Sequence, residues 1–176
     1  MNLKSLDGCK LVIGTYPPFS YDARNGGGEA TLDKTDKANI QSVIFKPNNF
    51  SIPPLTWENT KFLNVPLPPG LKIEMLMDKL EGTIDKNTGE IILFFESRFK
   101  FSICSIFFFP DLLVKSLLQS GKVKSNLYEE NGFGLRKDGK AKLVGIALIP
   151  ITGNKVLDKF LDLPNEALAV LNCEIK

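Results

Sequence analysis

The chain of 176 residues is 43% hydrophobic and 24% charged, and its formal net charge is +2. This composition is ordinary for a globular protein, argues against disorder, and predicts one domain over residues 1–176. The small net charge makes no electrostatic case for a nucleic-acid partner. No apolar run approaches the roughly 18 residues of a membrane span or forms a secretory signal. We therefore expect a soluble, cytoplasmic protein and not a membrane protein.

Histidine is absent from the sequence, which removes the usual general base near neutral pH and the commonest metal ligand. The cysteines Cys9, Cys104 and Cys173 are odd in number and lack C-x-x-C spacing, so neither a disulfide framework nor a zinc site is indicated. We expect no metal and no cofactor. An enzyme would have to rely on carboxylates, Tyr, Lys, Cys or Arg, and we favour a non-enzymatic function.

The first part of the chain predicts short strands separated by irregular segments. Residues 9–13 and 40–46 have the apolar pattern of strands. Residues 16–30 combine aromatics, two prolines and a glycine run, which is typical of a loop with a mobile tip. Residues 53–70 are rich in proline, which forbids most ladder hydrogen bonds. This segment carries the only tryptophan, Trp57; we favour packing onto the body of the protein, with a lid or a partner surface as the alternatives.

A β-hairpin is predicted in which residues 71–84 pair with the first part of residues 91–109. Apolar residues alternate along residues 71–84 and change phase near Asp78 and Lys79, which predicts a β-bulge. The sequence D-K-N-T-G-E at residues 85–90 predicts a tight turn with Gly89 at positive φ. Its spacing is like the start of a calcium loop, but the distal glutamate is missing and strands, not helices, flank it.

The clearest strand signal lies in residues 91–109, where apolar residues alternate with polar ones. The apolar positions are Ile91, Leu93, Phe95, Phe99, Phe101, Ile103, Phe107 and Phe109. One straight strand of this length would extend about 60 Å, so we expect a bend at residues 102–105 and burial of residues 106–109 on both faces. A strand that curves and serves two parts of a sheet is typical of barrels and orthogonal sandwiches.

The last third of the chain predicts two helices among further strands. Leucines at i, i+4 spacing in residues 111–120, followed by a glycine, predict a short amphipathic helix. Residues 122–130 and 140–149 look like hairpin arms, the second of them central in a sheet. Residues 154–161 place apolar side chains on one helical face and predict a second helix. Residues 166–175 alternate and predict a closing strand.

These elements predict a mainly β protein, an antiparallel β-barrel or a strongly bent β-sandwich with one or two short helices. A β-rich chain with a helix over one barrel end and an aromatic interior resembles the lipocalin-type superfamily. The chain departs from that pattern at the G-x-W signature, because Gly14 is followed by Thr15 and Tyr16. Residues 80–91 and 142–153 are also similar to small uncharacterised proteins of cyanobacteria and plastids. Neither resemblance assigns a catalytic residue.

Seven of the 13 phenylalanines lie between Phe94 and Phe109, and such a cluster would either line an apolar pocket or fill a packed core. The predicted ligand-binding residues are Trp57, Met75, Met77, Phe95, Phe99 and Phe101. The polar candidates are Glu96, Arg98 and Tyr128. Glu96 and Arg98 lie two residues apart on one strand face, where an arginine can keep a carboxylate ionised or bind an anionic substrate.

Three hypotheses for function follow. The leading one is binding of an apolar or amphipathic small molecule, such as a lipid or pigment, within a Phe-lined barrel. The alternative is an assembly or scaffold protein that contacts a protein partner or a second copy through residues 53–70 and the basic last third. The third is a histidine-free enzyme that uses carboxylate or Tyr chemistry, with Glu96 as its main candidate.

Overall fold

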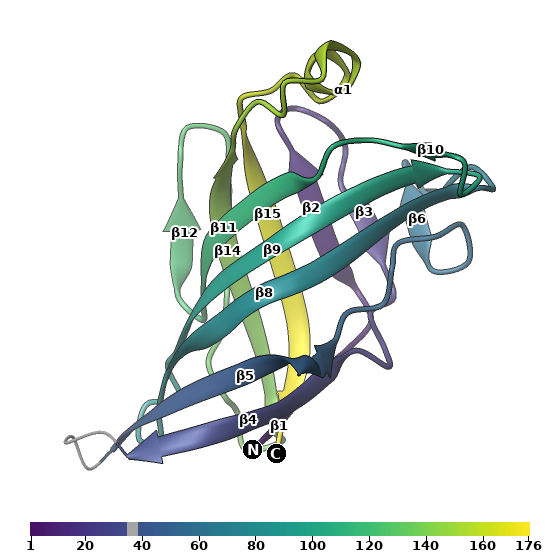
Figure 1. Cartoon of the computed structure of the whole chain (residues 1–176). Coiled ribbons are helices and arrows are strands. Elements are labelled where there is room, and N and C mark those ends of the chain that lie inside the picture. Colours follow the sequence, from purple (N-terminus) through teal and green to yellow (C-terminus); the bar gives the residue numbers. More distant parts are fainter. Residues whose placement is uncertain (35–38) are drawn as a thin grey trace.

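The structure is a computed structural model that describes residues 1–34 and 39–176 (Figure 1). As the sequence predicts, the described chain is mainly β, and its one helix is α1 (Lys155–Leu161). The strands are β1 (Asn2–Ser5), β2 (Cys9–Ile13), β3 (Phe19–Tyr21), β4 (Gly27–Lys34), β5 (Ile40–Ser51), β6 (Thr60–Phe62), β7 (Val65–Pro66), β8 (Leu71–Asp85), β9 (Ile91–Ile103), β10 (Phe107–Phe108), β11 (Leu112–Gln119), β12 (Lys122–Lys124), β13 (Glu129–Asn131), β14 (Lys140–Ile149) and β15 (Asn165–Ile175).

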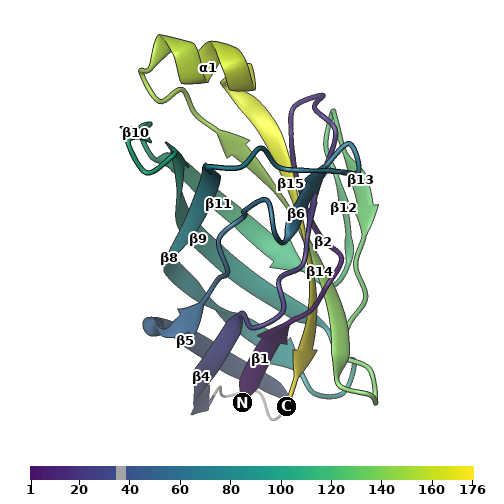
Figure 2. The same ribbon diagram turned by 90° about the vertical axis from the view of Figure 1, so that its right-hand side faces the viewer.

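Within the described residues, eight antiparallel strands form a closed ring in the order β1, β4, β5, β8, β9, β11, β14 and β15. β1 closes the ring because it pairs with β15 on one side and with β4 on the other. The two chain ends meet here, and the Asn2 N–H donates to the Lys176 carbonyl oxygen at 2.6 Å (Figure 2). Closure gives each of these eight strands a paired neighbour on both sides over at least part of its length.

The helix α1 lies at one end of the ring and the chain termini lie at the opposite end (Figures 1 and 2). Towards the end with α1, neighbouring strands of the ring separate. β15 pairs with β1 through residues 173–175 and with β2 through residues 167–170, and the sheet continues from β2 to β3, β6 and β7. β8 pairs with β5 only from Leu80 onward, while Leu55 bridges to its earlier half at Ile73. We call the two ends of the ring the α1 end and the termini end.

Close contacts between backbones make glycine necessary at the ring closure. Gly27 and Gly28 begin β4 and pair with β1, so the predicted mobile loop tip is wrong at these positions. A Cβ atom on Gly27, whose φ is +124°, would lie 2.0 Å from the carbonyl oxygen of Leu3. One on Gly28 would lie 2.0 Å from the carbonyl oxygen of Asn49 in β5. Only glycine lets β1, β4 and β5 lie at hydrogen-bonding distance here.

The predicted hairpin at residues 71–103 is confirmed in detail. β8 and β9 pair along their length, with a register shift between Met77 and Lys79, where the bulge was expected. The turn between them has Gly89 at a φ of 74°, and the Asp85 carboxylate accepts hydrogen bonds from the N–H groups of Asn87 and Thr88. An aspartate at this position stabilises a turn by this kind of local bond.

The predicted helix at residues 111–120 is wrong, because this segment is strand β11. It pairs with β9 from Leu112 to Gln119, and its side chains alternate between buried and exposed. Both faces carry apolar residues, so the leucine spacing fits a helix and a strand equally well. The unpaired edge of β9 decides the outcome, since strand pairing satisfies backbone groups along the whole edge. The helix predicted at residues 154–161 is confirmed as α1, with Asn154 as its N-cap.

Two further expectations need correction. The bend predicted at residues 102–105 is present, with positive φ at Cys104 and Ser105, but the chain then folds back so that β10 pairs with β9. Residues 106–108 are therefore exposed, although burial on both faces was expected. Residues 122–130 also do not pair with residues 140–149 as hairpin arms, because β12 pairs with β13. That small sheet covers an apolar cluster on the outside of β14 and β15.

The inner faces of the strands form two apolar clusters, one above the other. The termini-end cluster consists of Leu3, Val43, Phe45, Met77, Leu80, Ile84, Ile91, Leu93, Leu118, Ala141, Leu143, Cys173 and Ile175. The α1-end cluster includes Leu55, Ile73, Met75, Phe99 and Ile149, and α1 adds Leu157 and Leu161 to it. The termini end is therefore filled with side chains, and α1 covers part of the other end.

We expect Gly27→Ala to lower the free energy of unfolding by roughly 2–4 kcal/mol, because the added methyl group separates β1 from β4 and the φ angle is unfavourable for alanine. Urea denaturation followed by circular dichroism measures this change. The matched control is Gly121→Ala, where the nearest atom to a new Cβ is 3.9 Å away. That variant should stay within about 0.5 kcal/mol of the wild type. Equal effects for the two variants would contradict this account of ring closure.

Candidate apolar binding site

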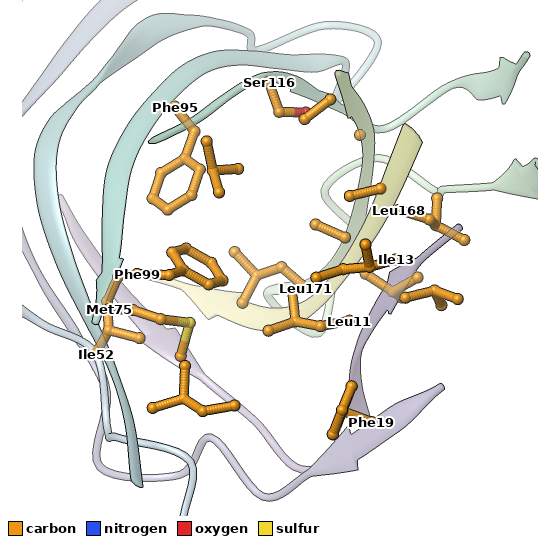
Figure 3. A pocket seen from close by; sticks show the side chains of 18 of the residues that line it. Leu11, Ile13, Phe19, Ile52, Met75, Phe95, Phe99, Ser116, Leu168 and Leu171 are labelled. Carbon is orange, nitrogen blue, oxygen red and sulfur yellow. The ribbon is translucent and has the colours of Figure 1, made fainter. Parts of the chain in front are cut away.

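A cavity of about 100 Å³ lies inside the ring, and its wall is made almost entirely of aliphatic and aromatic side chains (Figure 3). It reaches into both apolar clusters, with Leu80 and Leu118 from the termini-end cluster and Ile73 and Ile149 from the α1-end cluster among its lining. None of the lining side chains in the described chain is charged. The cavity is therefore a place for a molecule, or part of a molecule, that makes no ionic contacts.

β8 and β9 supply the bulky side of the cavity. Phe95, Phe99 and Phe101 occupy alternate positions of β9, so they point to the same face of the sheet, and Met75 joins them from β8. Figure 3 shows Phe95, Phe99 and Met75 together on one side of the cavity. These side chains have several rotamers or a flexible thioether, which allows them to adapt to an occupant.

β14 and β15 supply four small residues to the wall, beside larger ones such as Ile149 and Leu171. Gly145 and Ala147 of β14 pair with Ala169 and Ala167 of β15, and all four line the cavity. A Cβ on Gly145 would lie 2.4 Å from the hydroxyl oxygen of Ser116 in β11. The ring diameter is set by its strands and not by its side chains, so small residues on one side leave space that the bulky side does not fill.

Few polar side-chain atoms reach the wall of the cavity. The Ser116 hydroxyl donates to the Ile146 carbonyl oxygen at 3.2 Å. No buried side-chain nitrogen or oxygen in residues 1–34 and 39–176 lacks a hydrogen-bond partner. Burial raises the pKa of Tyr21, which also lines the cavity, so its hydroxyl stays neutral. An occupant would thus be selected by its shape and its apolar contacts, and not by hydrogen bonds to polar side chains of the wall.

Four of the six predicted ligand-binding residues line this cavity, namely Met75, Phe95, Phe99 and Phe101. The structure does not bring the other two to it. Met77 is buried in the termini-end cluster and is absent from the wall. Trp57 lies in the segment between β5 and β6, and 52% of its surface is exposed.

The three polar candidates are not brought together. Glu96 binds Lys115 at 2.8 Å, and Arg98 binds Asp78 at 2.7 Å, and these residues point away from the cavity. The Arg98 guanidinium lowers the pKa of the Asp78 carboxyl through its hydrogen bonds. Such exposed ion pairs contribute little to stability and are common on the wet face of a sheet. They provide no support for the hypothesis of carboxylate catalysis.

Tyr128 has a structural contact instead. Its hydroxyl donates to the carbonyl oxygen of Gly14 at 2.6 Å, which ties the β12–β13 hairpin to the end of β2. Partial burial raises the pKa of Tyr128 to about 12, with a smaller effect of the nearby Glu166 carboxylate. The hydroxyl therefore keeps its proton throughout the neutral range.

Sequence reasoning missed the small residues of β14 and β15. A signal was present, because Gly145 with Ala147 and Ala167 with Ala169 place small residues at alternate positions of two strands. Alternation of this kind puts every small side chain on the same face. Together with the phenylalanines of β9, this alternation would have predicted a ring with bulky side chains on one side of its interior and small side chains on the other.

Within the described residues, no helix is long and apolar enough to cross a membrane. No group of three or more Cys, Asp or Glu side chains in that part of the chain is placed to hold a metal ion. Comparisons of the chain with protein-family models, curated proteins and solved structures gave no match. Function must therefore be inferred from the cavity and the side chains around it.

The raised pKa of Tyr128 predicts a loss of stability in alkali. The folded-state pKa of about 12 lies above the value near 10 of an unfolded tyrosine. The neutral hydroxyl thus stabilises the fold fully below about pH 10, and this contribution is lost as the pH rises through about 12. We expect the melting temperature to fall less steeply with pH in Tyr128→Phe than in the wild type. Parallel curves between about pH 9 and pH 12 would contradict this assignment.

Proposed function

We propose that the protein binds an apolar or amphipathic small molecule, such as a lipid or pigment, inside the ring, and that the ring acts as a ligand-binding β-barrel of the lipocalin-like kind. The observation that supports this proposal is the apolar cavity inside the ring, lined chiefly by side chains of β8, β9, β11, β14 and β15. An empty apolar cavity of about 100 Å³ forgoes on the order of 2 kcal/mol of packing energy. A molecule that fills it would recover part of that energy.

The size of the cavity favours a slender occupant. Its volume of about 100 Å³ is smaller than the roughly 150 Å³ of a known apolar cavity that takes up benzene, and far below the roughly 300–1,000 Å³ of drug-sized sites. Only a few chain carbons fit without movement of the wall. A longer acyl chain would enter as Met75 and the phenylalanines change rotamer. Within the proposed ligand class, a linear hydrocarbon chain is therefore favoured over a rigid polycyclic pigment.

Ala147→Leu tests this proposal, because it adds three carbon atoms to the wall at a buried position. We expect the freshly purified wild type to show a non-covalent mass excess of a few hundred daltons in native mass spectrometry. A titration of the delipidated protein with dodecanoate should give at least about tenfold weaker binding for Ala147→Leu than for the wild type.

The matched control is Leu148→Ala, since Leu148 is the next residue of β14 and faces outward with 70% of its surface exposed. It should bind dodecanoate like the wild type. Unchanged binding in Ala147→Leu would place the ligand outside the cavity. A wild type that carries no ligand and binds no dodecanoate would mean that the interior is only a loosely packed core.

The alternative function, an assembly or scaffold protein, is supported by the exposure of Trp57. A half-exposed tryptophan is a typical contact residue at a protein interface. The basic last third gives this alternative less support, because Lys122 and Lys124 bind Glu129, and Lys142 binds Glu130. These two glutamates therefore offset part of the local positive charge.

If Trp57 contacts a second copy of the chain, Trp57→Ala should abolish a concentration-dependent dimer without changing dodecanoate binding. Light scattering after size-exclusion chromatography measures the mass of the species in solution. A wild type that stays monomeric over about a hundredfold range of concentration would contradict self-assembly through Trp57.

A further inference from the structure

Two apolar projections stand at the α1 end of the ring, where Figures 1 and 2 place both β10 and α1. The first is the turn after β9 and the start of β10, with Ile106, Phe107 and Phe108. The second is the outer side of α1, with Val156 and Phe160. We call these five residues the apolar rim. Each of them has between 64% and 73% of its surface exposed. Their grouping at one end of the ring, more than the exposure of any one of them, indicates a contact surface.

The first projection keeps its backbone hydrogen bonds inside the protein. The N–H of Cys104 donates to the Gly70 carbonyl oxygen at 2.8 Å, and the N–H of Ile106 donates to the Ile103 carbonyl oxygen at 3.1 Å. The N–H of Phe109 donates to the carbonyl oxygen of Phe101 at 3.1 Å. These three N–H groups of the turn thus have partners inside the protein, which lowers the cost of bringing the turn into an apolar phase.

The second projection combines apolar and cationic groups. Leu157 and Leu161 anchor α1 in the core, so the helix presents Val156 and Phe160 to the solvent together with Lys155 and Lys159. Neither lysine makes an ion pair within the described residues. The one carboxylate inside the helix, that of Asp158, accepts hydrogen bonds from the Thr152 hydroxyl and from the N–H groups of Thr152 and Gly153.

An aromatic side chain beside lysines suits the interface of a phospholipid bilayer. The ring lies at the depth of the headgroups, and the long lysine side chain reaches the phosphate oxygens. Phe160 is held in place, since the Tyr16 hydroxyl donates to its carbonyl oxygen and the two rings lie 6.2 Å apart. Two separate projections do not form a groove for a protein segment, whereas a fluid surface accepts both without a matching shape.

The cavity extends towards the same end. Ile13 is the last residue of β2, Phe19 is the first of β3, and both are half-buried lining residues next to that end. Phe101, also half-buried, lines the cavity near the end of β9, just before the first projection. The side chains of the termini-end cluster fill the other end of the ring.

We propose that the apolar rim docks the α1 end of the ring on a phospholipid bilayer surface, from which the lipid chain enters the cavity. This inference rests on the proposed function, because the bilayer is the source of the molecule that the cavity takes. Insertion is driven by the aromatic side chains, and the lysines of α1 add attraction to phosphate groups, which is stronger where the lipids are anionic.

Vesicle flotation with the full chain tests this docking. We expect the wild type to float with phosphatidylcholine vesicles, and to a greater extent when a quarter of the lipid is phosphatidylglycerol. The double variant Phe107→Ser with Phe108→Ser should lower the bound fraction at least about tenfold. The matched control is Leu117→Ser, which removes an exposed leucine from the outer wall of β11. It should float like the wild type.

Native mass spectrometry of the same proteins without vesicles separates the two proposals. The double variant should bind dodecanoate like the wild type, because the rim residues are outside the cavity wall. A wild type that binds dodecanoate but floats with neither vesicle overturns the docking and leaves the ligand proposal standing. Flotation of the double variant at the wild-type level also overturns it. So does a wild type that fails to float and instead dimerises in a way that the double variant does not.

Discussion

The close approach of three strands at Gly27 and Gly28 is the constraint on which the whole ring depends. β1 has only four residues, yet it is the element that joins β15 to β4. Any side chain at these two glycines would meet the backbone of a neighbouring strand at 2.0 Å. An opened ring would expose the inner faces of β4, β5 and β15 to water, and the interior would no longer be enclosed.

Within the closed ring, the interior is determined by the unequal size of the side chains. β8 and β9 provide phenylalanines and a methionine, whereas β14 and β15 provide a glycine and three alanines beside larger residues such as Leu171. Neither set alone produces a cavity, since bulky residues facing bulky residues would pack and small residues on all strands would let the core collapse. The two apolar clusters on either side hold the wall in place. The apolar interior and the apolar rim at its α1 end are the two features on which the proposed binding of lipid rests.

Secondary structure could be predicted correctly from the sequence where the two-residue periodicity of a strand was the only pattern present. In β8 and β9 the alternation, the phase change at Asp78 and the position of Gly89 correctly predicted the hairpin, the bulge and the positive φ in the turn. β11 was mistaken for a helix because leucines occupy both of its faces, and its pairing with a distant strand was invisible locally. Residues 106–108 were expected inside because their apolar character was taken as a sign of burial. The polar pair Glu96 and Arg98 was correctly placed on one strand face, but their partners Lys115 and Asp78 belong to neighbouring strands whose register the sequence does not reveal.

The ring closure also governs the order in which the chain can fold. The β8–β9 hairpin is local and can form early, but the pairing of Leu3 with Ile175 joins residues from the two extremes of the chain. Contacts of this separation carry the largest loop-closure entropy and form late. During synthesis, β15 follows all the other strands of the ring, so β1 and β14 each keep an unpaired edge until β15 has been made. The growing chain would therefore need protection from association along those edges until its final strand is in place.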